Sequence, residues 1–107
     1  MEKEIVVLIT ASSEAEAEKV GKTLVEEKLA ACVNLVRGVD SIFFWEGKVC
    51  RENEVLLLVK TRSDLFSALT AQVKSLHSYT VPEIIALPIL QGSEDYLRWI
   101  RESTRSA

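Results

Sequence analysis

The chain has 107 residues and a formal net charge of −3, with 48% hydrophobic and 27% charged side chains. These values fit one compact globular domain over residues 1–107 and exclude an intrinsically disordered chain, which combines low hydrophobicity with high net charge. Thirteen basic against sixteen acidic side chains give no basic surface for nucleic acid, and no apolar run approaches the roughly 20 residues that cross a bilayer.

The first predicted elements are a strand and a helix. Ile5–Ile9 is a run of β-branched and aliphatic residues, which is typical of a strand. This run is too short for a secretion signal and follows the charged start Met1–Glu4, so we expect a cytoplasmic protein. Ser13-x-x-Glu16 is a capping box, which predicts that a helix begins there.

A long hairpin is predicted next. Residues Ala31–Trp45 are extended, with an interruption at Arg37-Gly38 that we interpret as a bulge. Glu46-Gly47 forms a tight turn, and Val49–Thr61 returns as a strand. Fifteen extended residues span about 50 Å at roughly 3.3 Å each, whereas a domain of this size has a radius of gyration of about 13 Å. We therefore expect the hairpin to extend beyond its own domain.

The second half of the chain predicts a helix, a strand and a short final helix. Ser63 or Asp64 begins the helix, which carries apolar residues on one side. The strand runs from Glu83 to Leu90, and Pro88 within it indicates the edge of a sheet. Gly92-Ser93 opens the C-terminal helix.

The order β-α-β-β-α-β, followed by a short helix, predicts an α+β fold. The specific expectation is a ferredoxin-like βαββαβ sandwich with a long β-hairpin, a short C-terminal helix and both long helices on one face of the sheet. The first, third and fourth strands are apolar at consecutive rather than alternating positions, which predicts cover on both faces. Three helices do not supply that cover, so we expect another copy of the chain to do so.

Three segments carry a resemblance to a known family. Glu27–Asn34, Trp45–Lys48 and His77–Glu83 closely resemble the corresponding segments of the CutA divalent-cation tolerance family, and the resemblance extends from about Ile5 to Thr104. It implies a ferredoxin-like fold, a tight homotrimer and an association with copper and other divalent metals.

The chain departs from the family pattern at three positions. Ser78 stands where the family usually has proline, and Ile9 stands where some members carry a cysteine proposed as a copper ligand. Leu76 stands where some carry a second histidine, so His77 alone remains of those proposed ligands. We therefore expect Cu²⁺ or another divalent cation to bind weakly.

His77 and Glu83 are the candidate metal ligands. His77 is the single histidine, and a neutral imidazole is a good ligand for Cu²⁺. The alternative is that His77 caps the second helix and interacts with its dipole. Glu83, six positions later, either shares a metal site with His77 or is a solvent-facing charge or the partner of a basic residue. Tyr79 between them lines a cleft or holds the loop in place.

Other candidates lie on the hairpin. Trp45, beside Phe43 and Phe44, lines a ligand cleft together with Lys48, or the aromatic side chains pack across a subunit boundary. Cys50 is a candidate soft-metal or oxidation site. Cys32, among small apolar residues, fits the pattern of a buried, unreactive thiol.

Two hypotheses for the function follow. The chain has one histidine, no Gly-rich phosphate loop and no serine nucleophile motif, so we predict that it is not an enzyme. The first hypothesis is a cytoplasmic homotrimer that confers tolerance to divalent metal ions, copper in particular. The second is a PII-like trimeric signalling or scaffold module whose inter-subunit clefts bind a small anionic ligand or a protein partner. Coupling of folding to assembly predicts a thermostable protein in either case.

Overall fold

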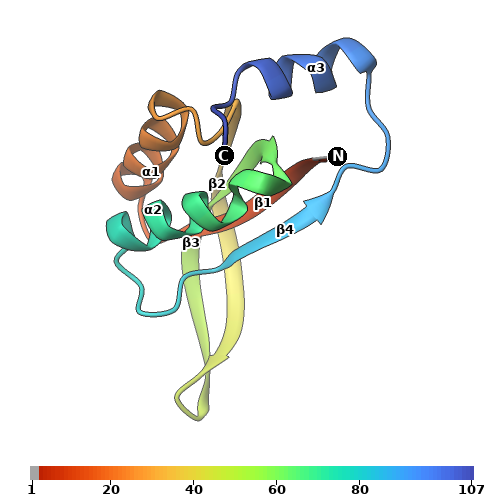
Figure 1. The fold of residues 1–107 in the computed structure, drawn as a ribbon. Coiled ribbons are helices and arrows are strands. Elements are labelled where there is room, and N and C mark those ends of the chain that lie inside the picture. Colours follow the sequence, from red (N-terminus) through yellow and green to blue (C-terminus); the bar gives the residue numbers. More distant parts are fainter. Residues whose placement is uncertain (1–2) are drawn as a thin grey trace.

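The computed structural model describes residues 3–107, so Met1 and Glu2 of the charged start lie outside the described residues. The elements follow the predicted order (Figure 1): β1 (Glu4–Ala11), α1 (Glu14–Glu26), β2 (Cys32–Trp45), β3 (Lys48–Arg62), a short 3-10 turn η1 (Ser63–Leu65), α2 (Phe66–Leu76), β4 (Ile84–Pro88) and α3 (Glu94–Glu102). Within residues 3–107, no helix is long and apolar enough to span a membrane.

The four strands form one antiparallel sheet in the order β2-β3-β1-β4. This arrangement, with the three helices, confirms the predicted α+β class. β4 is shorter than the expected Glu83–Leu90 and ends at Pro88, which is paired with Ile5 of β1. β4 lies at the edge of the sheet, where the missing N–H of proline breaks no ladder of hydrogen bonds.

The hydrophobic core lies between one face of the sheet and the two longer helices. Odd-numbered side chains of β1 and β3 alternate into this core, and both α1 and α2 pack on the same face, as predicted. The central members are fully buried: Val7, Ile9, Val20, Leu24, Leu57, Val59, Leu69 and Val73.

The opposite face of the sheet is also apolar but is only partly covered. Leu8 pairs with Leu58 of β3 and with Ile85 of β4, so these three side chains lie together on that face. Ile85 and Leu87 are each 51% exposed. The short helix α3 contacts this face at one end, where Arg101 lies 3.3 Å from Glu4. Apolar residues therefore line both faces of the central strands, as the uninterrupted apolar runs indicated.

The β2–β3 hairpin projects away from the rest of the domain (Figure 1), and the described chain, hairpin included, measures 43 × 26 × 22 Å. Glu46 and Gly47 have φ of 48° and 80°, which is the pair of positive values that a type I′ turn requires. Gly38, with φ of 71°, lies at the register shift between Val36 and Val39. Both the predicted turn and the predicted bulge are confirmed.

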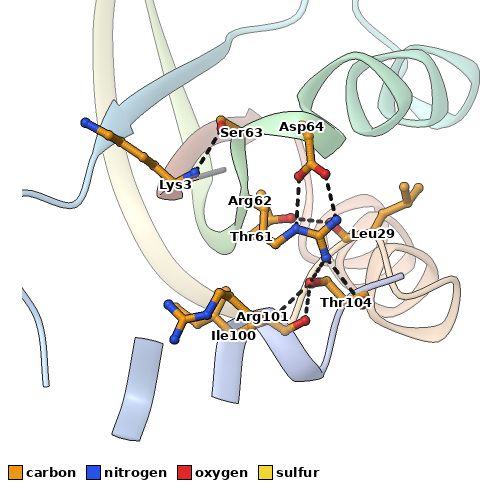
Figure 2. A network of polar contacts seen from close by, with 9 residues as sticks. All are labelled: Lys3, Leu29, Thr61, Arg62, Ser63, Asp64, Ile100, Arg101 and Thr104. Atoms are coloured by element: carbon orange, nitrogen blue, oxygen red, sulfur yellow. Dashed lines mark hydrogen bonds and ion pairs between the residues drawn. The ribbon is translucent and has the colours of Figure 1, made fainter. Parts of the chain in front are cut away.

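Arg62, the last residue of β3, is tied to the segment that follows α3 (Figure 2). Its Nε and Nη2 donate to the two carboxylate oxygens of Asp64 at 2.9 and 2.8 Å, and Nη1 donates to Thr104 Oγ1 at 2.8 Å. The Arg62 guanidinium lowers the pKa of Asp64 below its usual range. Nearby, Thr61 Oγ1 donates to the carbonyl of Leu29 at 2.7 Å. This network fixes the end of the molecule that is remote from the hairpin turn.

Candidate functional site

His77 lies immediately after α2 and is buried, with no exposed side-chain surface. Its Nε2 is 2.6 Å from the carbonyl oxygen of Thr10, and its Nδ1 accepts a hydrogen bond of 3.0 Å from the Tyr79 N–H. Because Nδ1 acts as an acceptor, the proton of the neutral ring lies on Nε2 and is donated to Thr10. His77 thus links β1 to the loop that follows α2.

This geometry bears on both interpretations of His77. The lone pair that a metal would use on Nδ1 already accepts the Tyr79 N–H, so ligation by His77 requires that hydrogen bond to break. Metal binding by His77 therefore stays a prediction. The imidazole does lie at the end of α2, but its hydrogen bonds with Thr10 and Tyr79 join it to β1 and to the loop.

Glu16 holds the same loop from the opposite side. Ser13 Oγ accepts the Glu16 N–H at 3.1 Å, which is one half of the predicted capping box. The Glu16 carboxylate accepts instead from the N–H groups of Ser12, at 3.3 Å, and Ser78, at 2.9 Å. Burial by itself would raise the pKa of Glu16, but these hydrogen bonds and the nearby His77 lower it overall. The first turn of α1 is thereby joined to the loop.

Tyr79 connects the loop to the base of the hairpin. Its hydroxyl donates a 2.7 Å hydrogen bond to Glu54 Oε2, and its ring centroid lies 4.7 Å from that of His77. Burial, followed by the hydrogen bond to Glu54 and the charge of Glu54, raises the pKa of Tyr79. Glu54 is only 6% exposed.

A groove of about 770 Å³ opens between the base of the hairpin and this loop. It brings together four of the residues predicted from sequence: Trp45, Cys50, Tyr79 and Glu83. The other lining residues are Thr10, Ser12, Ser41, Ile42, Phe43, Glu52, Glu54, Ser78, Thr80 and Val81. His77 and Lys48 are not among the lining residues; Lys48 pairs with Trp45 next to the hairpin turn and is exposed.

The groove is acidic. In the described part of the chain its lining includes Glu52, Glu54 and Glu83 and contains no lysine or arginine. Burial, with a further contribution from the charge of Glu54, raises the pKa of Glu83. A cation bound in the groove would lower the free-energy cost of ionising Glu83, because a nearby positive charge favours the ionised form of a carboxylate. Within residues 3–107, however, no group of three or more histidine, cysteine or carboxylate side chains is arranged to hold a metal ion.

The two cysteines occupy different surroundings. Cys50 is partly buried in the wall of the groove. The hypothesis that its thiol is a soft ligand for a metal in the groove requires this position. Cys32 lies away from the groove, with Sγ 3.8 Å from Asn34 Oδ1 and Tyr96 of α3 close by. Cys32 is partly rather than fully buried.

Sequence comparison gives a match over nearly the whole chain. The sequence model of the family described as CutA1 divalent ion tolerance protein matches residues 5–103. A protein of Thermus thermophilus named divalent-cation tolerance protein CutA is 56% identical over 101 residues, which cover 94% of this chain and 98% of that protein. Protein CutA of Homo sapiens is 46% identical over 98 residues, and the match covers 92% of this chain but 55% of the human protein.

Solved structures give the same result. The divalent cation tolerance protein of T. thermophilus superposes with a TM-score of 0.94 at 56% identity, covering 95% of this chain and 99% of that one. CutA1 of Oryza sativa superposes with a TM-score of 0.95 at 47% identity, covering 97% and 95%. The backbone described above is therefore similar to both structures over almost its full length.

Proposed function

This chain belongs to the CutA1 divalent ion tolerance protein family, and we propose that it confers tolerance to divalent cations, copper among them, by binding them weakly in the acidic groove. The observation that carries the proposal is the lining itself, with Glu52, Glu54 and Glu83 and no basic side chain among the described residues. Carboxylate oxygens suit hard divalent ions, and a thiol adds a softer ligand for copper.

In this proposal Glu83 is the principal ligand that the chain supplies, and the negative charge of Glu54 neutralises part of the positive charge of the bound ion. Both carboxylates line the groove, and the charge of Glu54 contributes to the raised pKa of Glu83, which supports their assignment to one site. Cys50 lines the same groove as an additional donor. Since two or three ligands leave most of a coordination sphere to water or to another subunit, we expect weak binding. His77 acts mainly by positioning the loop that carries Glu83.

We propose that the chain adopts a ferredoxin-like sandwich that assembles as a homotrimer. Two features support self-association. One face of the sheet is only partly covered and carries the apolar side chains of Leu8, Leu58, Ile85 and Leu87. Apolar patches of this kind on soluble proteins mark interaction surfaces. The hairpin also carries exposed apolar side chains far from the core, with Phe44 and Val49 each 71% exposed.

The acidic lining disfavours the anionic ligand of the PII-like alternative, because an anion in this groove would face three glutamates. We propose a binding role rather than catalysis, in the cytoplasm. Compartments differ among the relatives, since the names of two of them place one in the chloroplast of Arabidopsis thaliana and one in the periplasm of Archaeoglobus fulgidus.

Native mass spectrometry with and without Cu²⁺ tests the proposal, because it reports subunit number and bound ions in one spectrum. We expect a species with three times the 12.0 kDa mass of one chain, and additional copper-bound species when Cu²⁺ is present. A 12.0 kDa species that takes up no copper would contradict both parts of the proposal.

A further inference from the structure

Glu16 joins two segments of the groove wall, although it is not itself a lining residue. The wall includes Ser12, in the turn between β1 and α1, and Ser78, in the loop after α2. One carboxylate oxygen of Glu16 accepts the Ser78 N–H at 2.9 Å, and the other accepts the Ser12 N–H at 3.3 Å. The hydroxyl oxygens of the two serines are 3.5 Å apart. Glu16 therefore fixes these two parts of the groove wall to each other.

Three consecutive residues at the start of the loop are anchored to three different elements. His77 contacts a carbonyl of β1, and the Tyr79 hydroxyl donates to a carboxylate of β3. Ser78, between them, is held to α1 by Glu16. Glu83 follows in the same loop, directly before β4 begins. The place of the Glu83 carboxylate in the groove therefore depends on how firmly the start of the loop is held.

The anchor that Glu16 provides is charged and sheltered from water. Burial by itself would raise the pKa of Glu16, but its hydrogen bonds with Ser78 and Ser12 and the nearby His77 hold that pKa below its ordinary value. The carboxylate is therefore ionised at pH 7, and hydrogen bonds to an ionised acceptor are stronger than those between neutral groups. Its side chain is only 14% exposed, so water competes little for the Ser78 N–H.

We propose that Glu16 is a positioning residue of the groove, which acts through the Ser78 N–H to hold the loop in the arrangement that lets Glu83 bind a divalent cation. The proposal rests on the proposed function, since it concerns the same groove and the same ligand. Loss of a group that orients a metal ligand weakens metal binding by about 10–100-fold. Because Glu16 acts through the backbone of the loop, we expect the lower end of this range.

Calorimetric titration of the full chain with Cu²⁺ at pH 7 tests the proposal in two backgrounds. Ser78→Ala keeps the backbone N–H, whereas Ser78→Pro removes it, and the extended backbone of His77 (φ −90°, ψ 143°) is compatible with a following proline. Glu16→Ala should weaken Cu²⁺ binding about tenfold in the Ser78→Ala background. In the Ser78→Pro background it should change binding by less than about twofold, because the hydrogen bond is already absent. Equal effects in the two backgrounds, or no effect in either, would overturn the proposal.

Amide hydrogen exchange without metal is the second measurement, and it requires no proline variant. Glu16→Ala should accelerate exchange of the Tyr79 amide about tenfold more than that of Val59, a fully buried residue of β3 whose exchange reports global unfolding. Glu26→Ala, on the exposed side of α1, is the matched control and should leave both rates unchanged. Equal acceleration at Tyr79 and Val59 in Glu16→Ala would overturn the positioning role.

The two measurements separate this proposal from the proposed function. A wild-type protein that binds no Cu²⁺ rejects the metal role, and selective acceleration at Tyr79 then still supports positioning of the loop by Glu16. Cu²⁺ binding that is unchanged by Glu16→Ala overturns the positioning role and leaves the metal role in place.

Discussion

The hydroxyl of Tyr79 donates a hydrogen bond of 2.7 Å to Glu54 Oε2, which joins the loop after α2 to the base of the long hairpin. The two residues are 25 positions apart in the sequence and come from elements that do not follow one another. Together they form one wall of the acidic groove. The position of the loop that carries Glu83 therefore depends on a contact made by the hairpin.

Tyr79→Phe removes that hydrogen bond and leaves the buried Glu54 carboxylate without its donor. We expect the free energy of unfolding to fall by about 1.5–3 kcal/mol, as for other hydrogen bonds to charged groups. Urea denaturation at a fixed protein concentration measures the change. Tyr96→Phe is the matched control, since the partner of Tyr96 is the Cys32 thiol, a weak acceptor, and it should cost much less. Equal losses in the two variants would contradict this account.

Glu16→Gln tests the carboxylate that holds the other side of the loop. The hydrogen bonds from Ser78 and Ser12 keep the folded pKa of Glu16 below the unfolded value of 4.5. Its stabilisation is therefore fully present above pH 4.5 and is lost as the pH falls through the lower, folded pKa. We expect the variant to be less stable than the wild type at pH 7 and to approach the stability of the wild type as the pH falls through the folded pKa of Glu16.

Denaturation curves across this pH range provide the measurement for Glu16→Gln. Glu26→Gln, on the exposed side of the same helix, should show little difference from the wild type at any pH. A stability difference between Glu16→Gln and the wild type that persists unchanged at pH 2 would mean that the ionised carboxylate is not its cause.

His77→Ala separates the two roles considered for this residue. Because the ring is fully buried and both nitrogens are hydrogen bonded, we expect a loss of about 2–4 kcal/mol in stability. His77→Gln, which keeps a donor and an acceptor, should be less damaging and should bind Cu²⁺ within about twofold of the wild type. Loss of Cu²⁺ binding in a stably folded His77→Gln protein would instead show that His77 is a metal ligand.

Ile85→Lys places a charge on the partly covered apolar face of the sheet. We expect it to disrupt self-association, because burying an unpaired lysine at an apolar interface is costly. Sedimentation at micromolar concentration should then show smaller species than the wild type does. Val25→Lys is the control, since Val25 is 41% exposed on α1 and lies away from that face. Equal subunit numbers in the two variants would argue against an interface at Ile85.

Most of the fold could be predicted from local patterns. The capping serine Ser13, the turn at Glu46-Gly47 and the bulge at Gly38 each depend on neighbouring residues, and each is observed. β4 was predicted two residues too long at its C-terminal end, because the apolar residues Ile89 and Leu90 continue the pattern beyond the last paired residue, Pro88. At that end the pairing with β1 sets the length of the strand.

The site was predicted only in part. Trp45, Cys50, Tyr79 and Glu83 meet in one groove, as their positions in the resembling segments and on the hairpin indicated. Glu54 was not identified, and Glu16 was identified only as part of the capping box, because the partners Tyr79 and Ser78 come from distant elements and no local pattern indicates them. Glu54 directly precedes a run of buried strand residues, which is the one available sign that it is buried.

The central claim is that the acidic groove binds divalent cations through Glu83. Calorimetric titration of Cu²⁺ into the wild type and into Glu83→Gln, at pH 7 and with Cys50→Ser as the background to exclude thiol chemistry, tests it most directly. The account predicts weak binding to the parent protein that is reduced at least tenfold, or about 1.4 kcal/mol, by Glu83→Gln. Equal affinities in the two proteins would contradict it.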